Sequence, residues 1–397
     1  MIFLDNAASS HPKPPPVHAA VEAALRQAVA SDHGSGAAAA AGTRCLATAR
    51  QEAGALLGVA DPRRVVFTLN ATDALNMAIH GILEPGDHVV TSVGEHNAVC
   101  RPLTHLQMKG VIALTRVEID ADGGIALEAL DAAIQHRTRL VVLGHGNSVL
   151  GTLQPMEDIA RRVKARGARL LVDASHTAGR VPVDVDGWGL DAVAVSGHGA
   201  LMGPAGTGLL LVGDGLRIRP TRLGESGHRP AQTTHPLALP EALEAGMPNI
   251  PGIAGLGAGI RFIREVGVSR VREHETMMIK RFIGALGLDE RFTLYAARGD
   301  LPRTGTVSFN LGGFPPARLV EILERRAGVF MAAGLHGSPG VHRRLGTLDA
   351  GTVRASVGWF TREEEIDRSV AVLRSIAEDG LRRALGSVNA GEVAGAT

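Results

Sequence analysis

The chain of 397 residues is poor in cysteine and has almost no net charge. Cys45 and Cys100 cannot make a disulfide framework, so we expect a reducing compartment and place the protein in the cytoplasm. The 41 Lys and Arg residues are balanced by 40 Asp and Glu residues, which argues against a nucleic-acid partner. No signal peptide opens the chain, and no apolar run reaches about 18 residues, so no membrane partner is expected.

Lysine and aromatic residues are also scarce. Lys13, Lys109, Lys164 and Lys280 are the only lysines, and the other basic residues are arginines. Aromatic residues make up 3% of the chain while hydrophobic residues reach 45%, so the core is expected to be aliphatic. Because imine chemistry requires a primary amine, the scarcity of lysine limits the reactions open to this protein.

Short apolar runs alternate with helical patterns in the first half of the chain. Such runs are typical of strands buried on both faces, and the alternation predicts an α/β fold with a mostly parallel, doubly wound sheet. After about residue 215 the segment 216–253 is rich in Gly, Pro and His and is expected to be a long loop, followed by a helix-rich part. The expected strands are 65–69, 87–92, 140–143, 169–172, 192–196 and 208–212, and the expected helices between them are 71–82, 103–109, 126–135 and 155–165.

Polar residues follow several of these strands. Because parallel strands end at the same sheet edge, we expect the polar groups to meet there, where open α/β sheets bind ligands. A helix predicted to begin at Ala71-Thr72 would offer its N-terminus to a phosphate. The other polar groups are Asp173, Ser175 and His176 after one strand, Ser196 and His198 after the next, and His96 and His145 after two others.

Seven motifs occur in an order that resembles the class V aminotransferases, specifically the cysteine desulfurase-like branch of the fold-type I pyridoxal phosphate enzymes. The resemblance runs from about residue 2 to about residue 376, and it is the ordered combination that is specific. The motifs are Leu4-Asp5-Asn6-Ala7-Ala8, Asn70-Ala71-Thr72-Asp73-Ala74-Leu75-Asn76, Glu95-His96-Asn97, Val172-Asp173-Ala174, Ser196-Gly197-His198, Gly246-Met247-Pro248-Asn249 and Gly351-Thr352-Val353-Arg354.

This resemblance implies roles for individual residues. Asp173 would pair with the pyridinium nitrogen of the cofactor, and His96 would stack on its ring. Thr72, Ser196 and His198 would bind the phosphate, and His176 stands where the family has a glutamine that contacts the cofactor. Arg354 would grip a substrate carboxylate, with Asn6 also on the substrate side.

Two departures from the family concern its reactive residues. Gly199 stands where the family has the lysine that forms the Schiff base, and no other lysine is expected near that position. Gly337 stands where the family has the cysteine that forms a persulfide. Pyridoxal phosphate is therefore expected to bind non-covalently, if at all, and desulfuration is not expected.

The resemblance also implies the domain organisation. A large sheet domain is expected over residues 15–258, a smaller α+β domain over 1–14 plus 259–385, and a frayed tail over 386–397. A homodimer is expected, because in the family the segment equivalent to 246–251 completes the partner's cleft.

Three functions remain open at this point. The first is a pseudoenzyme that binds a small amino-acid-like ligand or acts as a regulator. The second is a metal enzyme, in which several histidines converge with Asp173 on a metal ion. The third is amino-acid chemistry with non-covalently bound pyridoxal or pyridoxamine phosphate, in which a histidine is the base. The histidines considered are His96, His145, His176, His198, His228 and His336.

Overall fold

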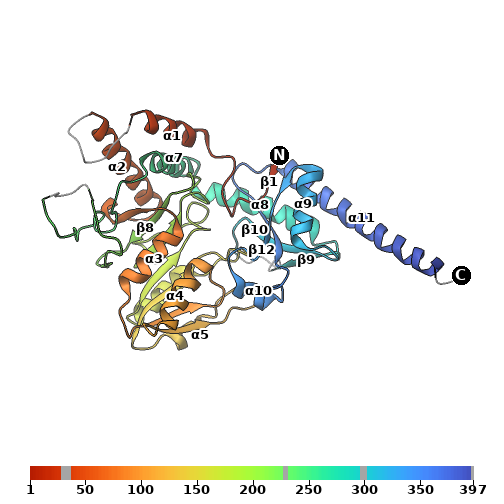
Figure 1. Ribbon diagram of the computed structural model, residues 1–397, viewed down its shortest axis with the longest axis horizontal. Coiled ribbons are helices and arrows are strands. Elements are labelled where there is room, and N and C mark those ends of the chain that lie inside the picture. The colour runs from red at the N-terminus through yellow and green to blue at the C-terminus, as the bar shows by residue number, and fades with distance from the viewer. Residues whose placement is uncertain (28–36, 227–230, 296–301, 395–397) are drawn as a thin grey trace.

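A computed structural model describes residues 1–27, 37–226, 231–295 and 302–394 of the chain. It has a large sheet domain and a smaller domain beside it, which carries the C-terminal helix (Figure 1). Within the described ranges, no helix combines the length and the apolar character needed to cross a membrane. His228 lies outside the described residues.

The large domain is built on a seven-stranded sheet. Strand β8 is antiparallel to both of its neighbours, and every other pairing in the sheet is parallel. The expected mostly parallel α/β sheet is therefore confirmed. In spatial order the strands are β2 (Val65–Thr68), β8 (Gly208–Val212), β7 (Ala192–Ser196), β6 (Arg169–Asp173), β5 (Thr138–Gly144), β3 (His88–Ser92) and β4 (Ala113–Val117).

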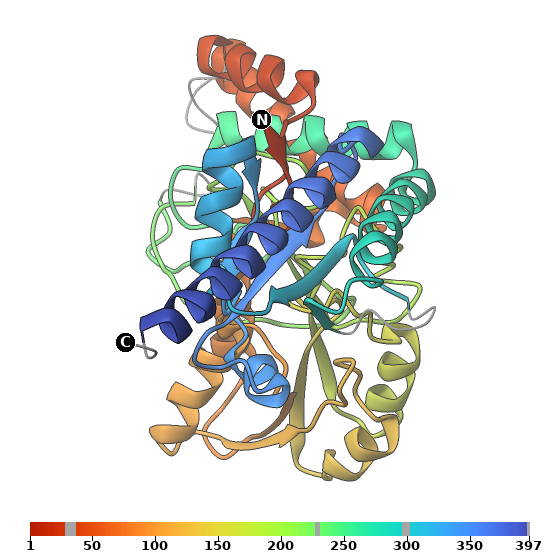
Figure 2. The same cartoon turned by 90° about the vertical axis from the view of Figure 1, so that its right-hand side faces the viewer.

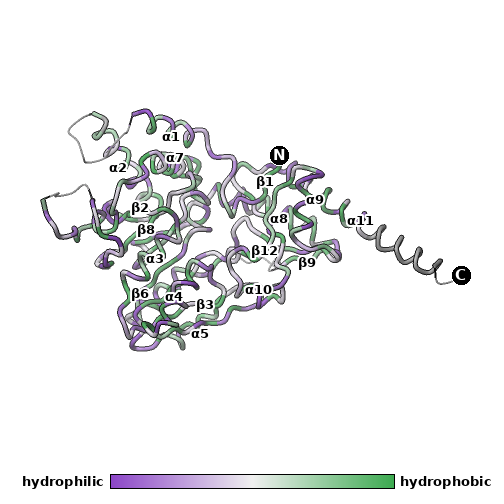
Figure 3. Tube along the Cα trace, viewed as in Figure 1, coloured by the Kyte–Doolittle hydropathy of each residue, from purple (hydrophilic) through white to green (hydrophobic). Residues whose placement is uncertain are grey.

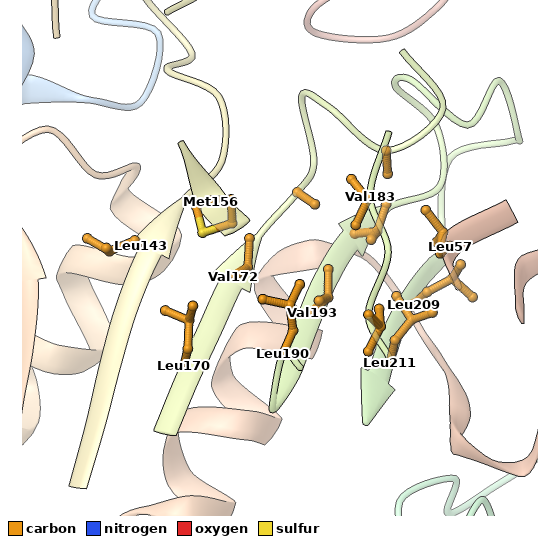
Figure 4. Close-up of a cluster of buried hydrophobic side chains, with 14 of the residues drawn as sticks. Leu57, Leu143, Met156, Leu170, Val172, Val183, Leu190, Val193, Leu209 and Leu211 are labelled. Atoms are coloured by element: carbon orange, nitrogen blue, oxygen red, sulfur yellow. The ribbon is translucent and has the colours of Figure 1, made fainter. Parts of the chain in front are cut away.

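Both faces of this sheet are buried, which explains the continuous apolar runs. In β6, Leu170 and Val172 belong to one hydrophobic cluster while Leu171 belongs to the cluster on the opposite face. Side chains of β5 to β8 gather on the first face together with Leu57 and Met156 (Figure 4). The helices are α1 (Pro15–Gln27), α2 (Ala37–Leu57), η1 (Pro62–Arg64), α3 (Ala71–Ile82), α4 (Asn97–Met108), α5 (Leu127–Ala133), α6 (Met156–Ala165) and α7 (Ile250–Val266).

The small domain contains a four-stranded antiparallel sheet with helices packed on it (Figure 2). Its apolar core includes Phe282, Phe309 and Leu4, and the hydropathy-coloured trace shows hydrophobic and hydrophilic residues interspersed along these elements (Figure 3). The strands in order are β12 (Ala332–Gly334), β13 (Thr352–Ser356), β10 (Thr306–Leu311) and β9 (Phe292–Tyr295), and the helices are α8 (Val268–Leu286), α9 (Pro316–Ala327), α10 (Pro339–Leu345) and α11 (Glu363–Ala394).

The N-terminus of the chain joins the C-terminal part. Strand β1 (Ile2–Phe3) pairs in parallel with β11 (Val329–Phe330). The segment that follows β1 then crosses to the large domain, where Ser10 N–H donates to the carbonyl oxygen of His198 at 3.1 Å. Helix α11 includes the first part of the segment 386–397, which we expect to be frayed.

Candidate functional site

A cavity of about 290 Å³ lies at the carboxyl ends of β6 and β7. The N-terminal turn of α3 and residues of the small domain form its other walls. Gly199 and Arg354 line this cavity. So do all six residues that the sequence assigns to the cofactor, namely Thr72, His96, Asp173, His176, Ser196 and His198.

One end of the cavity is suited to a phosphate. Asn70 caps α3 by accepting the N–H of Asp73 at 2.9 Å, so the helix begins at Ala71 and Thr72 lies in its first turn. Opposite, Ser196 Oγ lies 3.1 Å from His198 Nδ1. The helix dipole, the free N–H groups and two hydroxyls together favour an anion at this end.

Asp173 is held in a fixed orientation at the end of β6. Its Oδ1 accepts hydrogen bonds from Ser175 Oγ at 2.6 Å and from Ser175 N–H at 3.0 Å. Since the same residue lines the cavity, a carboxylate is presented to any ligand bound there. A protonated ring nitrogen is the kind of group that such a carboxylate stabilises.

His96 combines a structural and a ligand-facing position. Its Nδ1 accepts the N–H of Ala98 at 3.1 Å and so caps α4, which leaves the proton of the neutral ring on Nε2. Gly337 lies against the Nε2 side, because a Cβ added to it would be 2.1 Å from that atom. The carbonyl of Gly337 also accepts the N–H of Asn97 at 2.7 Å. Segment 335–338 is therefore seated on His96.

The histidines of the cavity are held in the neutral form. Burial lowers the pKa values of His96, His198 and His176, that of His176 well below the ordinary range. Burial, assisted by the charge of Arg354, also lowers the pKa of His336 to about 3. Neutral imidazoles can donate and accept hydrogen bonds, and they can accept protons from a ligand.

The histidines do not support a metal site. His96, His176, His198 and His336 line the cavity, whereas His145 is packed edge-on against Trp188 with the ring centroids 5.8 Å apart. In the described parts of the chain, no three His, Cys, Asp or Glu side chains are grouped so that they could hold a metal ion. The metal alternative is therefore not supported by any group of ligands among these residues.

Arg354 is buried and already bound to the protein. It is 5% exposed, and its guanidinium donates to Asp5 Oδ1 at 2.9 Å and to the carbonyl of Ser148 at 3.1 Å. Its buried Nε has no hydrogen-bond partner among the described residues. The fork expected to grip a carboxylate is thus largely occupied, and the buried Nε is left without a partner in the part of the chain that the structure describes.

Asn6 is placed differently from the expectation. Its side-chain amide donates to the carbonyls of Phe3 and Ser356, both at 3.2 Å, and accepts the N–H of His11 at 3.1 Å. Asn6 is 2% exposed and is not among the residues that line the cavity, although Ala7 and Ala8 are. Its amide therefore fixes the N-terminal segment.

Lys13 is the site residue that sequence reasoning missed. The expectation that no lysine lies near position 199 is wrong for Lys13, because its Nζ is 2.7 Å from the carbonyl oxygen of His198. Burial and the nearby charge of Arg180 lower the pKa of Lys13 to about 8. The contact joins residues remote in sequence, so no local pattern reveals it.

Glu95 is a buried carboxyl group beside the cavity. Its oxygens accept hydrogen bonds from Ser92 Oγ at 2.6 Å and from Gly144 N–H at 2.8 Å. Burial, assisted by the charge of Asp173, raises the pKa of Glu95 to about 7. The folded protein therefore binds a proton that the unfolded chain releases at lower pH.

Replacing Glu95 by Gln is expected to change the pH dependence of stability. A raised pKa in the folded state means that the stabilisation is complete below the unfolded pKa and is lost as the pH rises towards 7. Wild type should therefore lose about 3 kcal/mol relative to Glu95→Gln between pH 4.5 and 7.5. Denaturant unfolding at both pH values measures the difference. Replacement of the exposed Glu265 by Gln is the control. If the free energy of unfolding depends on pH in the same way in wild type and in Glu95→Gln, the raised pKa of Glu95 is contradicted.

The chain's residues fit a group with a phosphate at one end and a protonatable ring nitrogen at the other. The α3 terminus and Asp173 lie on the walls of one cavity, which the neutral ring of His96 also lines. Arg354 lines the same cavity from the small domain, and its buried Nε has no hydrogen-bond partner within the described ranges. These are the requirements of pyridoxal phosphate with a bound anionic ligand.

Comparisons with known proteins agree with this geometry. Residues 2–368 match the family model for class-V aminotransferases. A probable cysteine desulfurase of Methanothermobacter thermautotrophicus is 30% identical over 392 residues, which cover 96% of this chain and 95% of that protein. A probable cysteine desulfurase of Pyrococcus abyssi is 31% identical over 79% of each chain. The apo structure of a cysteine desulfurase from Thermococcus onnurineus NA1 superposes with a TM-score of 0.88 at 29% identity, covering 95% of both chains.

Proposed function

Because the chain belongs to the class-V aminotransferase family, in its cysteine desulfurase-like part, we propose that it binds pyridoxal phosphate non-covalently and is a pseudoenzyme for desulfuration. The proposal depends on one observation above all. Gly199 lies on the cavity wall without a side chain, at the position where the family resemblance puts the Schiff-base lysine. The fold and the polar walls of the site are retained while this amine is absent.

The retained residues account for binding. Thr72, Ser196 and His198 would hold the phosphate, Asp173 would pair with the ring nitrogen, and His96 would lie against the ring. When bound, the cofactor supplies a protonated ring that withdraws electrons from an attached group. Asp173 keeps that ring nitrogen protonated, because a carboxylate at hydrogen-bond distance favours the charged form of its partner.

Sulfur transfer lacks its nucleophile. Gly337 stands at the cysteine position, and the segment around it is held by Asn97 N–H and by Ser148 Oγ, which lies 2.8 Å from Ser338 Oγ. Burial raises the pKa values of both thiols in the chain, that of Cys100 to about 11, so neither is activated as a thiolate. A persulfide-forming step therefore has no group to carry it.

The ligand that accompanies the cofactor is a small amino-acid-like molecule. Arg354 lines the cavity and would place a positive charge near the carboxylate of such a ligand.

The proposed functional unit is a homodimer. Leu69 and Met247 are 55% and 63% accessible and border a separate hollow of about 150 Å³. Exposed apolar side chains grouped in this way are typical of an interface.

A second candidate function is amino-acid chemistry on the non-covalent cofactor with a histidine as base. It is favoured by the position of His176, whose imidazole lines the cavity together with Asp173. Exchange of the ligand's Cα proton for deuterium, lost in His176→Gln, separates this candidate from a binding protein without turnover.

Borohydride reduction tests the proposed function. Wild type loaded with pyridoxal phosphate should bind about one equivalent by equilibrium dialysis, and reduction should fix none of it to the chain, because no lysine occupies position 199. Intact mass spectrometry reads the fixation. Asp173→Ala should weaken binding at least about ten-fold, since a charged hydrogen bond is lost. Fixation to any of the four lysines of wild type, or sulfide release from cysteine, would falsify the proposal.

A further inference from the structure

We propose that Lys13 is a positioning residue for the anion end of the cavity. Its ammonium group donates to the carbonyl oxygen of His198 at 2.7 Å and to Ser10 Oγ at 2.8 Å. His198 and Gly199, on either side of that carbonyl, both line the cavity. The charge of Lys13 is thus held against the turn that carries the phosphate-binding imidazole. This inference rests on the proposed binding of the cofactor in this cavity.

Several donors from the N-terminal segment converge on this one carbonyl. Besides Lys13, Ser10 N–H donates to it at 3.1 Å and Ser9 Oγ at 3.2 Å. A charge-assisted bond is the strongest of these, so Lys13 contributes most to fixing the turn after β7. The orientation of the His198 ring towards Ser196 follows from the position of this backbone.

The charge of Lys13 also reaches the ring itself. Burial lowers the pKa of His198 first, and the positive charge of Lys13 lowers it further. Arg180 faces Lys13 from the segment after β6, and its Nε lies 3.3 Å from Oε1 of buried Glu275 on α8. Lys13 and Arg180 thus place positive charge beside the neutral imidazole of His198, and this charge would attract a phosphate. An anion in the cavity therefore stabilises the protonated form of Lys13.

Two consequences can be measured. Without the charge, affinity for a phosphate-bearing ligand should fall, whereas affinity for the same ring without phosphate should stay close to that of wild type. With the wild-type residue, affinity for the phosphate-bearing ligand should decline as the pH rises through about 8, the pKa of Lys13 in the folded protein. Arginine stays charged at that pH, so the decline should be absent in Lys13→Arg.

The experiment measures the affinity of the full-length protein for pyridoxal 5′-phosphate, pyridoxal and inorganic phosphate by equilibrium dialysis at pH 7 and pH 9. Lys13→Met should weaken binding of pyridoxal phosphate about ten-fold at pH 7 and leave pyridoxal binding unchanged. Lys13→Arg should bind pyridoxal phosphate like wild type at pH 7 and keep that affinity at pH 9, where wild type should bind it more weakly. It should bind pyridoxal like wild type at both pH values. Exposed Lys109→Met at the end of α4 is the matched control and should behave as wild type.

The outcomes separate the inference from the proposed function. If Lys13→Met loses affinity equally for pyridoxal and for pyridoxal phosphate, the role of Lys13 is merely structural and the inference is overturned. Unchanged affinity for both ligands overturns it as well. If wild type binds inorganic phosphate but not pyridoxal phosphate, the proposed function fails. The role of Lys13 is then tested by measuring the affinity of the same variants for inorganic phosphate. Binding of none of the three ligands overturns both. If Lys13→Met does not fold, the inference is still tested by comparing how the affinity for pyridoxal phosphate depends on pH in wild type and in Lys13→Arg.

Discussion

Replacing Gly199 by lysine is expected to create a covalent cofactor site where wild type has none. The fraction of chains that retain pyridoxal phosphate after borohydride reduction should rise from none to nearly all. A Cβ built at Gly199 has the carbonyl oxygen of Ser175, at 3.7 Å, as its nearest neighbour outside the adjoining residues, which is ordinary van der Waals contact. The backbone there is not left-handed either, so the position accepts a side chain without strain.

The neighbouring glycines show that this freedom is specific to position 199. A Cβ at Gly197 would lie 2.2 Å from Thr207 Oγ1, and one at Gly203 would lie 2.9 Å from Leu256 Cδ1. Those two glycines are required by packing, whereas Gly199 is not. The structure around position 199 therefore has room for a longer side chain.

Gly199→Met is the matched control for this prediction, because it supplies similar length without an amine. Intact mass and peptide mapping should place the reduced cofactor on residue 199 of Gly199→Lys alone. A visible absorbance band that borohydride removes should appear in the same variant. Absence of fixation in a folded Gly199→Lys that still binds the cofactor would show that the cavity no longer presents the aldehyde to this position.

The sequence was sufficient for the central sheet and for most of the cavity wall. Strands buried on both faces, such as β6 and β7, have continuous apolar runs that stand out, and the polar residues that follow them necessarily meet at one edge. The half-exposed edge strand β4 and the polar strand β13 were missed because neither has such a run. Helix α4 begins earlier than expected, since its cap is the imidazole of His96 and Pro102 interrupts its pattern.

The contacts between remote segments could not be predicted. Lys13 reaches His198 across 185 positions of sequence, and Arg354 is bound to Asp5 across 349. Motif resemblance placed Arg354 and Asn6 on the substrate side, but only the folded chain reveals that the Asn6 amide and both terminal nitrogens of Arg354 already donate to the protein. The contact of Gly337 with His96 is of the same kind, because it depends on how the small domain is seated on the large one.

A side chain at Gly337 is expected to be poorly tolerated, in contrast to one at Gly199. Gly337 has φ +75°, and a Cβ there would lie 2.1 Å from His96 Nε2. Gly337→Ala should lower the free energy of unfolding by about 2 kcal/mol or more, from left-handed backbone strain and the clash together. Gly337→Cys should be similarly destabilised and should not gain desulfurase activity, because segment 335–338 has no room for the side chain in this position.

Gly346→Ala isolates the backbone contribution. Gly346 has φ +69°, close to that of Gly337, but no atom outside its neighbours lies within 4 Å of an added Cβ. Its replacement should cost only about 1 kcal/mol, so the excess at Gly337 measures the contact with His96. Denaturant unfolding of both variants provides the comparison.

A double-mutant cycle between Gly337→Ala and His96→Ala then assigns the clash to its partner. If the imidazole is what the new methyl group meets, Gly337→Ala should cost about 1 kcal/mol less in the His96→Ala background than in wild type. Equal costs in both backgrounds would mean that the segment moves away from His96 at no expense. In that case the contact of Gly337 with His96 would not explain why this position lacks a side chain. A cysteine at position 337 would then not be excluded by the clash.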